Sequence, residues 1–228
     1  MEENNIIDIN FGKKRFDAII CLNANLPGRQ FFEMMELPVL AADGASIRLL
    51  NINIKADYIV GDLDSFDSEK YSNEFVDSEI IFDPSQDSND FEKVLKFAAG
   101  KGFQTLLITG FHGGQLEHTF NNWSVLMRYS KILNICIFDE NRYGICFIDS
   151  FRLNTKIDEL ISLIPQPKVK IKTKNLKWEL NDEFLELGVR EGARNRAVAE
   201  HIEIKIGEGS LVAFFDARLP YAPKMSEP

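Results

Sequence analysis

The chain has 228 residues, of which 45% are hydrophobic and 27% charged, as is typical of a soluble globular protein with one large domain or two small ones. No apolar run approaches the ~20 residues of a membrane span, and the polar start is unlike a signal peptide. We therefore expect a cytoplasmic protein that does not enter a membrane. The three cysteines lie in apolar runs without metal or pairing spacing, which predicts buried thiols in a reducing compartment.

The charge of the chain is uneven. Residues 1–150 carry 13 Lys and Arg against 23 Asp and Glu, a net charge of −10, whereas residues 151–228 carry a net charge of +1. An acidic first part argues against nucleic acid as a partner, because phosphate backbones are bound by basic surfaces. It suits a region that concentrates divalent cations, although a solvated acidic surface explains the charge equally well.

Short apolar runs alternate with helical patterns in the first 150 residues. Strands are predicted at residues 16–22, 38–42, 58–60, 79–82, 104–109, 135–138 and 143–148. Helices are predicted at 45–50, 90–99 and 117–129, the second of them with Ser88 or Asn89 as its N-cap. This alternation predicts an α/β domain over residues 1–150, with a parallel, Rossmann-like sheet covered by helices on both faces.

Polar or glycine residues follow four of these strands, at 43–44, 61–65, 83–90 and 110–114. Ligands bind beyond the carboxyl ends of the strands in such sheets, so these segments predict one site. The most distinctive segment is Gly61-Asp62-Leu63-Asp64. Two carboxylates so close repel each other unless a cation lies between them, and clustered carboxylate oxygens suit Mg²⁺. Ordinary turn chemistry also explains an Asp-rich loop, and that alternative stays open at this point.

The pattern changes after residue 150. Short, partly alternating runs are predicted as strands at residues 161–164, 169–173, 176–180, 184–187, 198–206 and 211–215. Proline and glycine separate these runs, and no helical pattern accompanies them. Residues 151–228 are therefore predicted to form a small antiparallel β-sandwich domain.

Motifs spread along most of the chain resemble those of the thiamine pyrophosphokinase family. In chain order they are Ala42-Asp43-Gly44-Ala45, Gly61-Asp62-Leu63-Asp64-Ser65, Gln86-Asp87-Ser88-Asn89-Asp90, Gly113-Gly114-Gln115-Leu116-Glu117-His118 with Asn122, and Leu176-Lys177-Trp178 with Arg194-Asn195. The sequence departs from the family pattern at Asn89, which replaces Thr, at Gln115, which replaces a phosphate-facing Arg, and at Glu117, which replaces Asp.

The resemblance implies an enzyme that transfers diphosphate from Mg-ATP to the hydroxyl of thiamine and releases AMP. It also implies a homodimer in which thiamine lies between the first domain of one subunit and the second domain of its partner. The implied catalytic residues are Asp62, Asp64 and Asp90, and the implied Mg²⁺ ligands are Asp62, Asp64, Asp87 and Asp90. The implied ATP-binding residues are Asp43, Gly44, Ser65, Gln86, Asn89, Gly113, Gly114, Gln115 and His118, and the implied thiamine-binding residues are Arg194 and Asn195.

Several residues have simpler interpretations. Asp87 and Asp90 suit a helix N-terminus, and His118 suits a hydrogen bond at a helix start. Trp178 is predicted to be a core residue, with ligand stacking as the alternative. Arg48 and Lys93 are candidates for a cation that replaces the missing Arg at position 115.

Two other functions remain possible on the sequence alone. One is a different Mg²⁺-dependent phosphotransferase or phosphohydrolase, including one with an aspartyl nucleophile, and the other is a nucleotide sensor without turnover. No Gly-x-x-x-x-Gly-Lys-Ser/Thr segment is present, so the motifs exclude a P-loop enzyme.

Overall fold

The computed structural model describes residues 6–64 and 74–226. The chain forms two compact units, which we call the α/β unit, Phe16–Asp139, and the β unit, Met1–Arg15 with Glu140–Pro228. The expected boundary at residue 150 differs from the one between these units, because residues 142–154 pair with a long strand near the C-terminus. No helix in the described residues is long and apolar enough to cross a membrane.

The α/β unit contains a sheet of six parallel strands in the order β7-β6-β2-β3-β4-β5. The strands are β2 (Ala18–Cys21), β3 (Val39–Ala42), β4 (Tyr58–Gly61), β5 (Glu79–Phe82), β6 (Thr105–Thr109) and β7 (Asn134–Asp139). The described helices are α1 (Arg29–Met35), α2 (Ala45–Leu50), α4 (Asp90–Gly100) and α5 (Leu116–Tyr129). The predicted parallel sheet is confirmed, and each predicted element of this unit lies within two residues of its observed bounds.

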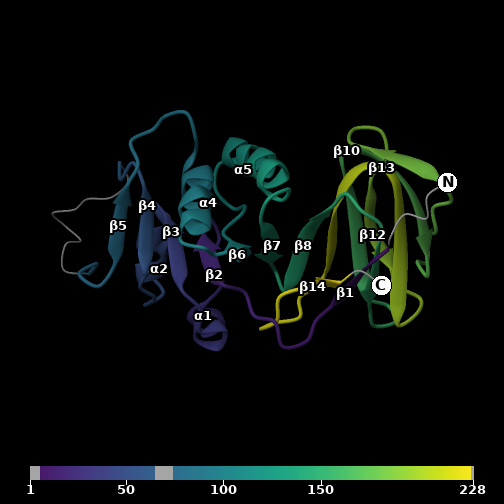
Figure 1. The fold of residues 1–228 in the computed structure, drawn as a ribbon, viewed down its shortest axis with the longest axis horizontal. Coiled ribbons are helices and arrows are strands. Elements are labelled where there is room, and N and C mark those ends of the chain that lie inside the picture. The colour runs from purple at the N-terminus through teal and green to yellow at the C-terminus, as the bar shows by residue number, and fades with distance from the viewer. Residues whose placement is uncertain (1–5, 65–73, 227–228) are drawn as a thin grey trace. The chain divides into compact units, whose positions relative to one another are not determined.

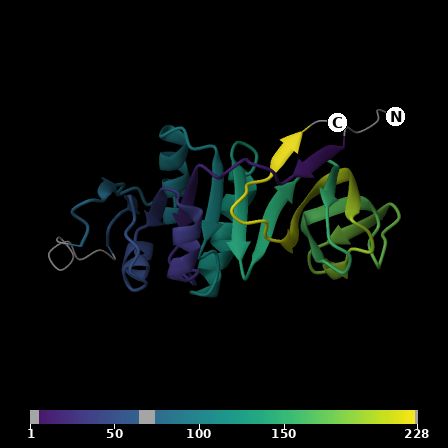
Figure 2. The same cartoon turned by 90° about the horizontal axis from the view of Figure 1, so that it is seen from below.

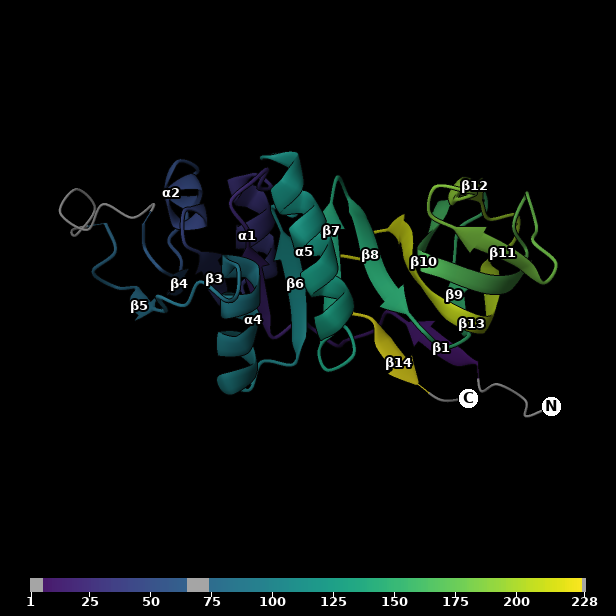
Figure 3. The same ribbon diagram turned by 90° about the horizontal axis from the view of Figure 1, so that it is seen from above.

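Helices lie on both sides of this sheet, with α1 and α2 on one side and α4 and α5 on the other (Figure 3). The central strands β2, β3 and β6 are buried at every position, which explains their continuous apolar sequences. Helix α1 was not predicted, because it is only seven residues long and has no side-chain N-cap. Its buried Phe31, Phe32 and Met35 fix it instead, so tertiary packing decides its conformation.

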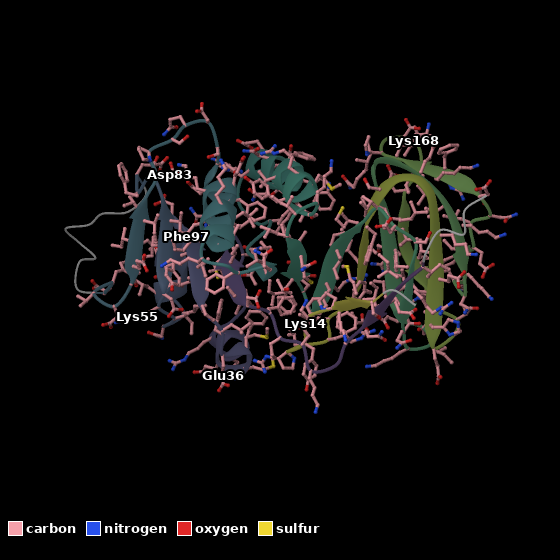
Figure 4. The ribbon with its side chains drawn as sticks, viewed as in Figure 1. Lys14, Glu36, Lys55, Asp83, Phe97 and Lys168 are labelled. Atoms are coloured by element: carbon pink, nitrogen blue, oxygen red, sulfur yellow. The ribbon has the colours of Figure 1, made fainter. Side chains whose placement is uncertain are left out.

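Helix α4 positions several candidate site residues. Asn89 is its N-cap, and the Asn89 side chain accepts a hydrogen bond from the backbone N–H of Glu92 at 2.9 Å. The buried face of α4, which includes Phe91 and Leu95, packs on the sheet. Phe97, labelled in Figure 4, adds an aromatic contact to Tyr58 of β4, with ring centroids 5.2 Å apart. The start of α4 is therefore fixed at the carboxyl edge of the sheet.

The β unit is built around two long antiparallel strands, β10 (Leu160–Lys174) and β13 (His201–Asp216) (Figure 1). Its other strands are β1 (Ile7–Asn10), β8 (Arg142–Phe147), β9 (Phe151–Asn154), β11 (Glu183–Glu186), β12 (Gly192–Arg196) and β14 (Lys224–Ser226). Strand β1 pairs antiparallel with β14, beside it in Figure 2, and parallel with β9. The predicted antiparallel pairing is found for the other pairs, whereas the β1–β9 pair is parallel; the division into two sandwich sheets stays a prediction.

Two predicted strand boundaries in the β unit are wrong. The runs at 161–164 and 169–173 belong to one strand, β10. Residues 201–206 and the run at 211–215 belong to another, β13, whereas residues 198–200 precede it. Pro165 and Gly209 are among the prolines and glycines between the predicted runs, but they lie at an irregularity where the register of the β10–β13 pair shifts. Residues 176–180 form no strand; an isolated bridge joins Leu176 to Ala197, and side-chain hydrogen bonds hold Trp178 and Leu180.

The cysteines agree with the prediction except at one position. Cys21 and Cys136 are buried, whereas Cys146 is partly exposed, and all three are free thiols.

Candidate functional site

A cavity of about 840 Å³ lies at the carboxyl edge of the parallel sheet, and all of its lining residues belong to the α/β unit. The chain runs outward from β2 to β5 and then returns to the other side of β2 as β6. The loops after β2 and β6 therefore leave the sheet in different directions and open a crevice, which is where sheets of this type bind ligands. Both loops line the cavity, through Leu22–Ala24 and Gly110–Phe111.

Most of the predicted site residues of this unit line the cavity. The acidic ones are Asp43, Asp62, Asp64, Asp87 and Asp90. The others are Gln86, Asn89, Gly114, Gln115 and His118. Gly44 and Gly113 are adjacent to lining residues in the chain but do not line the cavity themselves, and Ser65 lies outside the described residues.

Three carboxylates converge in this cavity. Asp43 follows β3, Asp62 and Asp64 follow β4, and each offers an oxygen atom within 4.8 Å of the other two. Asp43 is buried, Asp62 is partly exposed and Asp64 is exposed, so the group reaches from the protein interior to solvent. Three converging carboxylates provide the hard oxygen ligands that Mg²⁺ prefers, and these residues therefore fit a divalent cation. From the sequence, Asp43 was expected to bind ATP and was not expected to be a metal ligand. Its position beside Asp62 depends on the pairing of β3 with β4, which the sequence pattern does not show.

Gly61 makes this convergence possible. A Cβ atom at position 61 would lie 2.8 Å from Cβ of Asp43 and 3.4 Å from Oδ1 of Asp90. Only glycine lets the end of β4 come so close to both aspartates. Leu63, between Asp62 and Asp64, has a φ of 60°, an unusual conformation for this residue type.

A buried lysine balances part of the negative charge. Lys93 extends from α4, and its Nζ lies 3.1 Å from Oδ2 of Asp62 and 3.4 Å from Oδ1 of Asp90. Burial lowers the pKa of Lys93, but the hydrogen bond and charge interactions with the two carboxylates outweigh this effect and raise it. Lys93 therefore stays protonated and holds Asp62 and Asp90 together.

The two carboxylates bound to Lys93 respond differently. Burial raises the pKa of Asp62, but hydrogen bonds from Lys93 and the backbone N–H of Asp64 outweigh burial and lower it. The pKa of Asp90 is raised, first by burial and then by the neighbouring charges of Asp43 and Asp62, although Lys93 opposes the shift. Asp62 is therefore the better anion and Asp90 the better proton acceptor.

The segment before α4 adds polar contacts. Gln86 donates a hydrogen bond from Nε2 to Oδ2 of Asp62 at 3.3 Å, and Asn89 donates from Nδ2 to Oδ1 of Asn122 on α5 at 3.2 Å. Asp87 lines the cavity but does not belong to the group of three converging carboxylates.

The loop after β6 forms the opposite wall. Gly110 and Gly113 have φ angles of 68° and 104°, which L-residues with side chains rarely adopt. Gln115 is the N-cap residue of α5, and its Oε1 lies 2.9 Å from Nε2 of His118, so the simple helix-start interpretation of His118 fits this contact. Position 115 therefore presents a neutral side chain to the cavity.

Sequence reasoning missed Asn23 and Arg128. Asn23 follows β2 at the same edge of the sheet, and its Oδ1 accepts a hydrogen bond from Nε of Arg48 at 2.6 Å. Arg128 pairs with Glu92 at 2.6 Å, between α5 and α4. The rule that polar residues after parallel strands form the site would have found Asn23; no sequence signal relates Arg128 to Glu92.

The predicted thiamine-binding residues lie in the β unit. Asn195 on β12 is buried, and its Oδ1 accepts hydrogen bonds from the backbone N–H groups of Trp178 and Arg196. Its Nδ2 donates to the carbonyl of Trp178 at 2.7 Å, so Asn195 fixes the loop that carries Trp178. Arg194 is exposed and has a φ of 61°. Trp178 is 57% exposed, and the prediction that it is a core residue is wrong, because its run forms a loop rather than an inward-facing strand.

Comparison with known proteins agrees with this geometry. Residues 33–137, which include all five cavity-lining aspartates, match the family model of the thiamin pyrophosphokinase catalytic domain. Residues 33–137 are therefore similar to the catalytic domain of thiamin pyrophosphokinases. The resemblance inferred from the motifs is therefore confirmed, and the matched domain is that of an enzyme. No curated protein matches the sequence.

Solved structures of thiamin pyrophosphokinases share the fold over most of the chain. The protein from Geobacillus thermodenitrificans is 20% identical, with 89% of this chain and 98% of that chain covered and a TM-score of 0.74. Yeast thiamin pyrophosphokinase is 17% identical, with 90% and 87% covered and a TM-score of 0.74. A probable thiamine pyrophosphokinase from Staphylococcus saprophyticus subsp. saprophyticus is 23% identical, with 88% and 97% covered and a TM-score of 0.66. The fold of thiamin pyrophosphokinases is thus found over both units of this chain.

Proposed function

We propose that this chain is a Mg²⁺-dependent thiamine diphosphokinase that transfers diphosphate from ATP to the hydroxyl of thiamine and releases AMP. The observation that carries the proposal is the convergence of Asp43, Asp62 and Asp64 within a segment that matches the catalytic domain of this family. Transfer of this kind depends on positioning and on neutralised phosphate oxygens, so a covalent protein nucleophile is not needed.

Asp43, Asp62 and Asp64 would hold the metal, with Asp87 and Asp90 on the same side of the cavity as further candidates. Bound Mg²⁺ would neutralise phosphate oxygens and so favour attack on phosphorus. Lys93 keeps Asp62 ionised and in place, as a cation-binding carboxylate must be.

Asp90 is our candidate for accepting the proton of the thiamine hydroxyl. The hydroxyl oxygen would attack the β-phosphorus of ATP, the bond from that phosphorus to the α–β bridging oxygen would break, and AMP would leave with that oxygen. The hydroxyl proton would pass to a carboxylate oxygen of Asp90, whose raised pKa suits a general base better than that of Asp62.

For thiamine we keep the proposal that Arg194 and Asn195 contribute, now with a more specific role for Asn195. Because Asn195 hydrogen-bonds the backbone of Trp178 on both sides, it would act by positioning the exposed Trp178 loop. We further propose a homodimer with composite sites in the cytoplasm. Mixing Asp62→Asn and Asn195→Ala chains should then regenerate activity in heterodimers, whereas full activity of a strict monomer in sedimentation would contradict the dimer.

The reaction itself is tested by product analysis. The chain is incubated with ATP, thiamine and Mg²⁺, and the nucleotide and thiamine products are separated. We expect AMP and thiamine diphosphate in equal amounts, and no product when a chelator removes the metal. Formation of ADP, or of free phosphate with a phospho-aspartate at Asp62, would instead indicate another phosphotransferase or phosphohydrolase. Binding of ATP without any product would indicate a nucleotide sensor.

A further inference from the structure

We propose that Arg48 supplies the charged contact to the phosphate groups of the nucleotide in this chain. This inference rests on the proposed function, because it assumes that the cavity binds Mg-ATP. Lysine and arginine side chains line the described cavity at three positions, Arg48, Lys93 and Arg128. They differ in how much of their charge is already compensated.

Lys93 and Arg128 are both committed to carboxylates. Lys93 is buried and lies within 3.4 Å of two aspartates, Asp62 and Asp90. The guanidinium of Arg128 lies 2.6 Å from Oε2 of Glu92, whose side chain is only 16% exposed. A phosphate group would have to displace a carboxylate to reach Lys93, and breaking a buried pair is costly. Arg128 is 52% exposed, but the charge of its guanidinium is already offset by Glu92. The expectation that Lys93 covers the phosphates is therefore not supported by its contacts.

Arg48 is held by a neutral partner instead. It is exposed on α2, and its Nε donates a hydrogen bond to Oδ1 of Asn23 at 2.6 Å. Within residues 6–64 and 74–226, Arg48 makes no ion pair, and its two terminal nitrogens have no hydrogen-bond partner. A guanidinium fixed through Nε keeps its terminal N–H groups for a forked contact to an anion, and phosphate oxygens match that geometry.

The anchor of Arg48 adjoins the glycine loop of the cavity. The backbone oxygen of Asn23 lies 3.5 Å from the position that a Cβ at Gly114 would occupy, and the backbone N–H of Asn25 donates to the carbonyl of His112. Arg48, Asn23 and Gly114 thus form one continuous wall, which continues to Gln115. Because Gln115 is neutral and bonded to His118, the cation on this wall is Arg48.

The test measures equilibrium binding of Mg-ATP to the full chain by calorimetry. Arg48→Gln keeps a donor for Asn23 but removes the charge, so we expect binding to weaken by about 10- to 100-fold, the range of a charged hydrogen bond. Arg48→Lys should retain part of the affinity. Arg29→Gln is the matched control, because Arg29 is also an arginine of the α/β unit but pairs with Glu33 on the surface of α1, and binding should stay within twofold.

A rescue variant separates charge from structure. Position 115 lies on the same wall, so Gln115→Arg in the Arg48→Gln background should recover most of the lost affinity, whereas a purely structural defect would not be repaired. Binding within twofold of the parent in Arg48→Gln, or no recovery in the double variant, would overturn the inference. Thiamine diphosphate formation by the parent is measured separately, so failure of the proposed function is distinguishable from failure of this residue assignment.

Discussion

The two units of this protein use buried charge in opposite ways. In the β unit, Glu159 is fully buried, and both of its oxygens bond to Arg218, at 2.7 and 2.8 Å, and to backbone N–H groups of Lys156 and Asp216. In the described residues of the α/β unit, Lys93 alone forms ion pairs with Asp62 and Asp90, and Asp43 and Asp64 lie close to Asp62. The first arrangement is neutral and closed, whereas the second keeps excess negative charge beside a cavity.

This difference supports the proposal that the α/β unit performs the chemistry. A neutral, fully hydrogen-bonded pair has no capacity left for a ligand and acts on stability. A group of carboxylates with too little positive charge is stabilised by a bound cation or by a proton, and a bound cation is what phosphoryl-type transfer requires.

The largest effect is expected when the negative charge of the α/β unit is removed. Asp62→Asn and Asp64→Asn should each lower the turnover number by about 10³-fold or more, because each loses a candidate metal ligand. Steady-state kinetics measure the effect, and circular dichroism checks the fold. Asp77→Asn is the control, since Asp77 makes only an exposed ion pair with Lys55. Turnover within a few-fold of the parent in either site variant would contradict the metal assignment.

The converse experiment targets the β unit. Glu159→Ala leaves Arg218 and two backbone N–H groups without their partner, so we expect the free energy of unfolding to fall by about 3–5 kcal/mol. Urea unfolding measures it. Glu186→Ala provides the control, because Glu186 and its partner Lys168 are 41% and 48% exposed, and the loss of this pair should cost about 1 kcal/mol or less. Equal losses of unfolding free energy in the two variants would contradict a larger contribution of the buried Glu159–Arg218 pair to stability.

A smaller effect on turnover is expected when only the distance between β4 and Asp43 is changed. Gly61→Ala places a Cβ 2.8 Å from Cβ of Asp43, so the carboxylates must move apart, and turnover should fall by about 10²-fold without any change in charge. Gly100→Ala on α4 is the matched control, because no atom lies within 4 Å of its added Cβ. Unchanged turnover in Gly61→Ala would mean that the close approach of β4 to Asp43 has no role.

The smallest expected effect is on the pH dependence of stability, through the buried thiol of Cys21 in the core of the α/β unit. Burial raises the pKa of the Cys21 thiol from 9.0 to about 12, although a hydrogen bond with Thr109 opposes the shift. The raised folded pKa means that this contribution to stability is complete below pH 9 and is lost as the pH rises toward 12. Unfolding curves at pH 8 and 10 should therefore show about 1 kcal/mol more loss in the parent than in Cys21→Ala. Equal losses in both proteins would indicate that the thiol ionises freely in the folded state.

The sequence predicted the α/β unit better than the β unit for a physical reason. Parallel strands buried on both faces have continuous apolar runs. Helix α4 is predictable from its N-cap residue Asn89 and from its apolar face. Strands β10 and β13 continue through Pro165 and Gly209, because long-range pairing overrides local breakers at an irregular register. The prediction for Trp178 is wrong for a similar reason, since hydrogen bonds between its backbone and the Asn195 side chain hold its run as a loop.

The site was predictable as a set but not in its internal arrangement. Acidic residues after several parallel strands predict a shared site, and the cavity contains all five proposed aspartates. The grouping of Asp43 with Asp62 and Asp64 follows from the pairing of β3 with β4 and from the absence of a side chain at Gly61. The role of Lys93 as partner of Asp62 and Asp90 likewise depends on how α4 packs against the sheet.

Direct metal binding tests the central claim, that Asp43, Asp62 and Asp64 hold a divalent cation. Titration with Mn²⁺, followed by electron paramagnetic resonance, should show binding to the parent chain that Mg²⁺ displaces. Asp43→Asn is the most informative variant, because Asn tolerates the φ of 37° at this position while losing the charge. We predict at least tenfold weaker Mn²⁺ binding in Asp43→Asn and unchanged binding in the Asp77→Asn control. Equal Mn²⁺ affinity in the parent and Asp43→Asn would contradict the account.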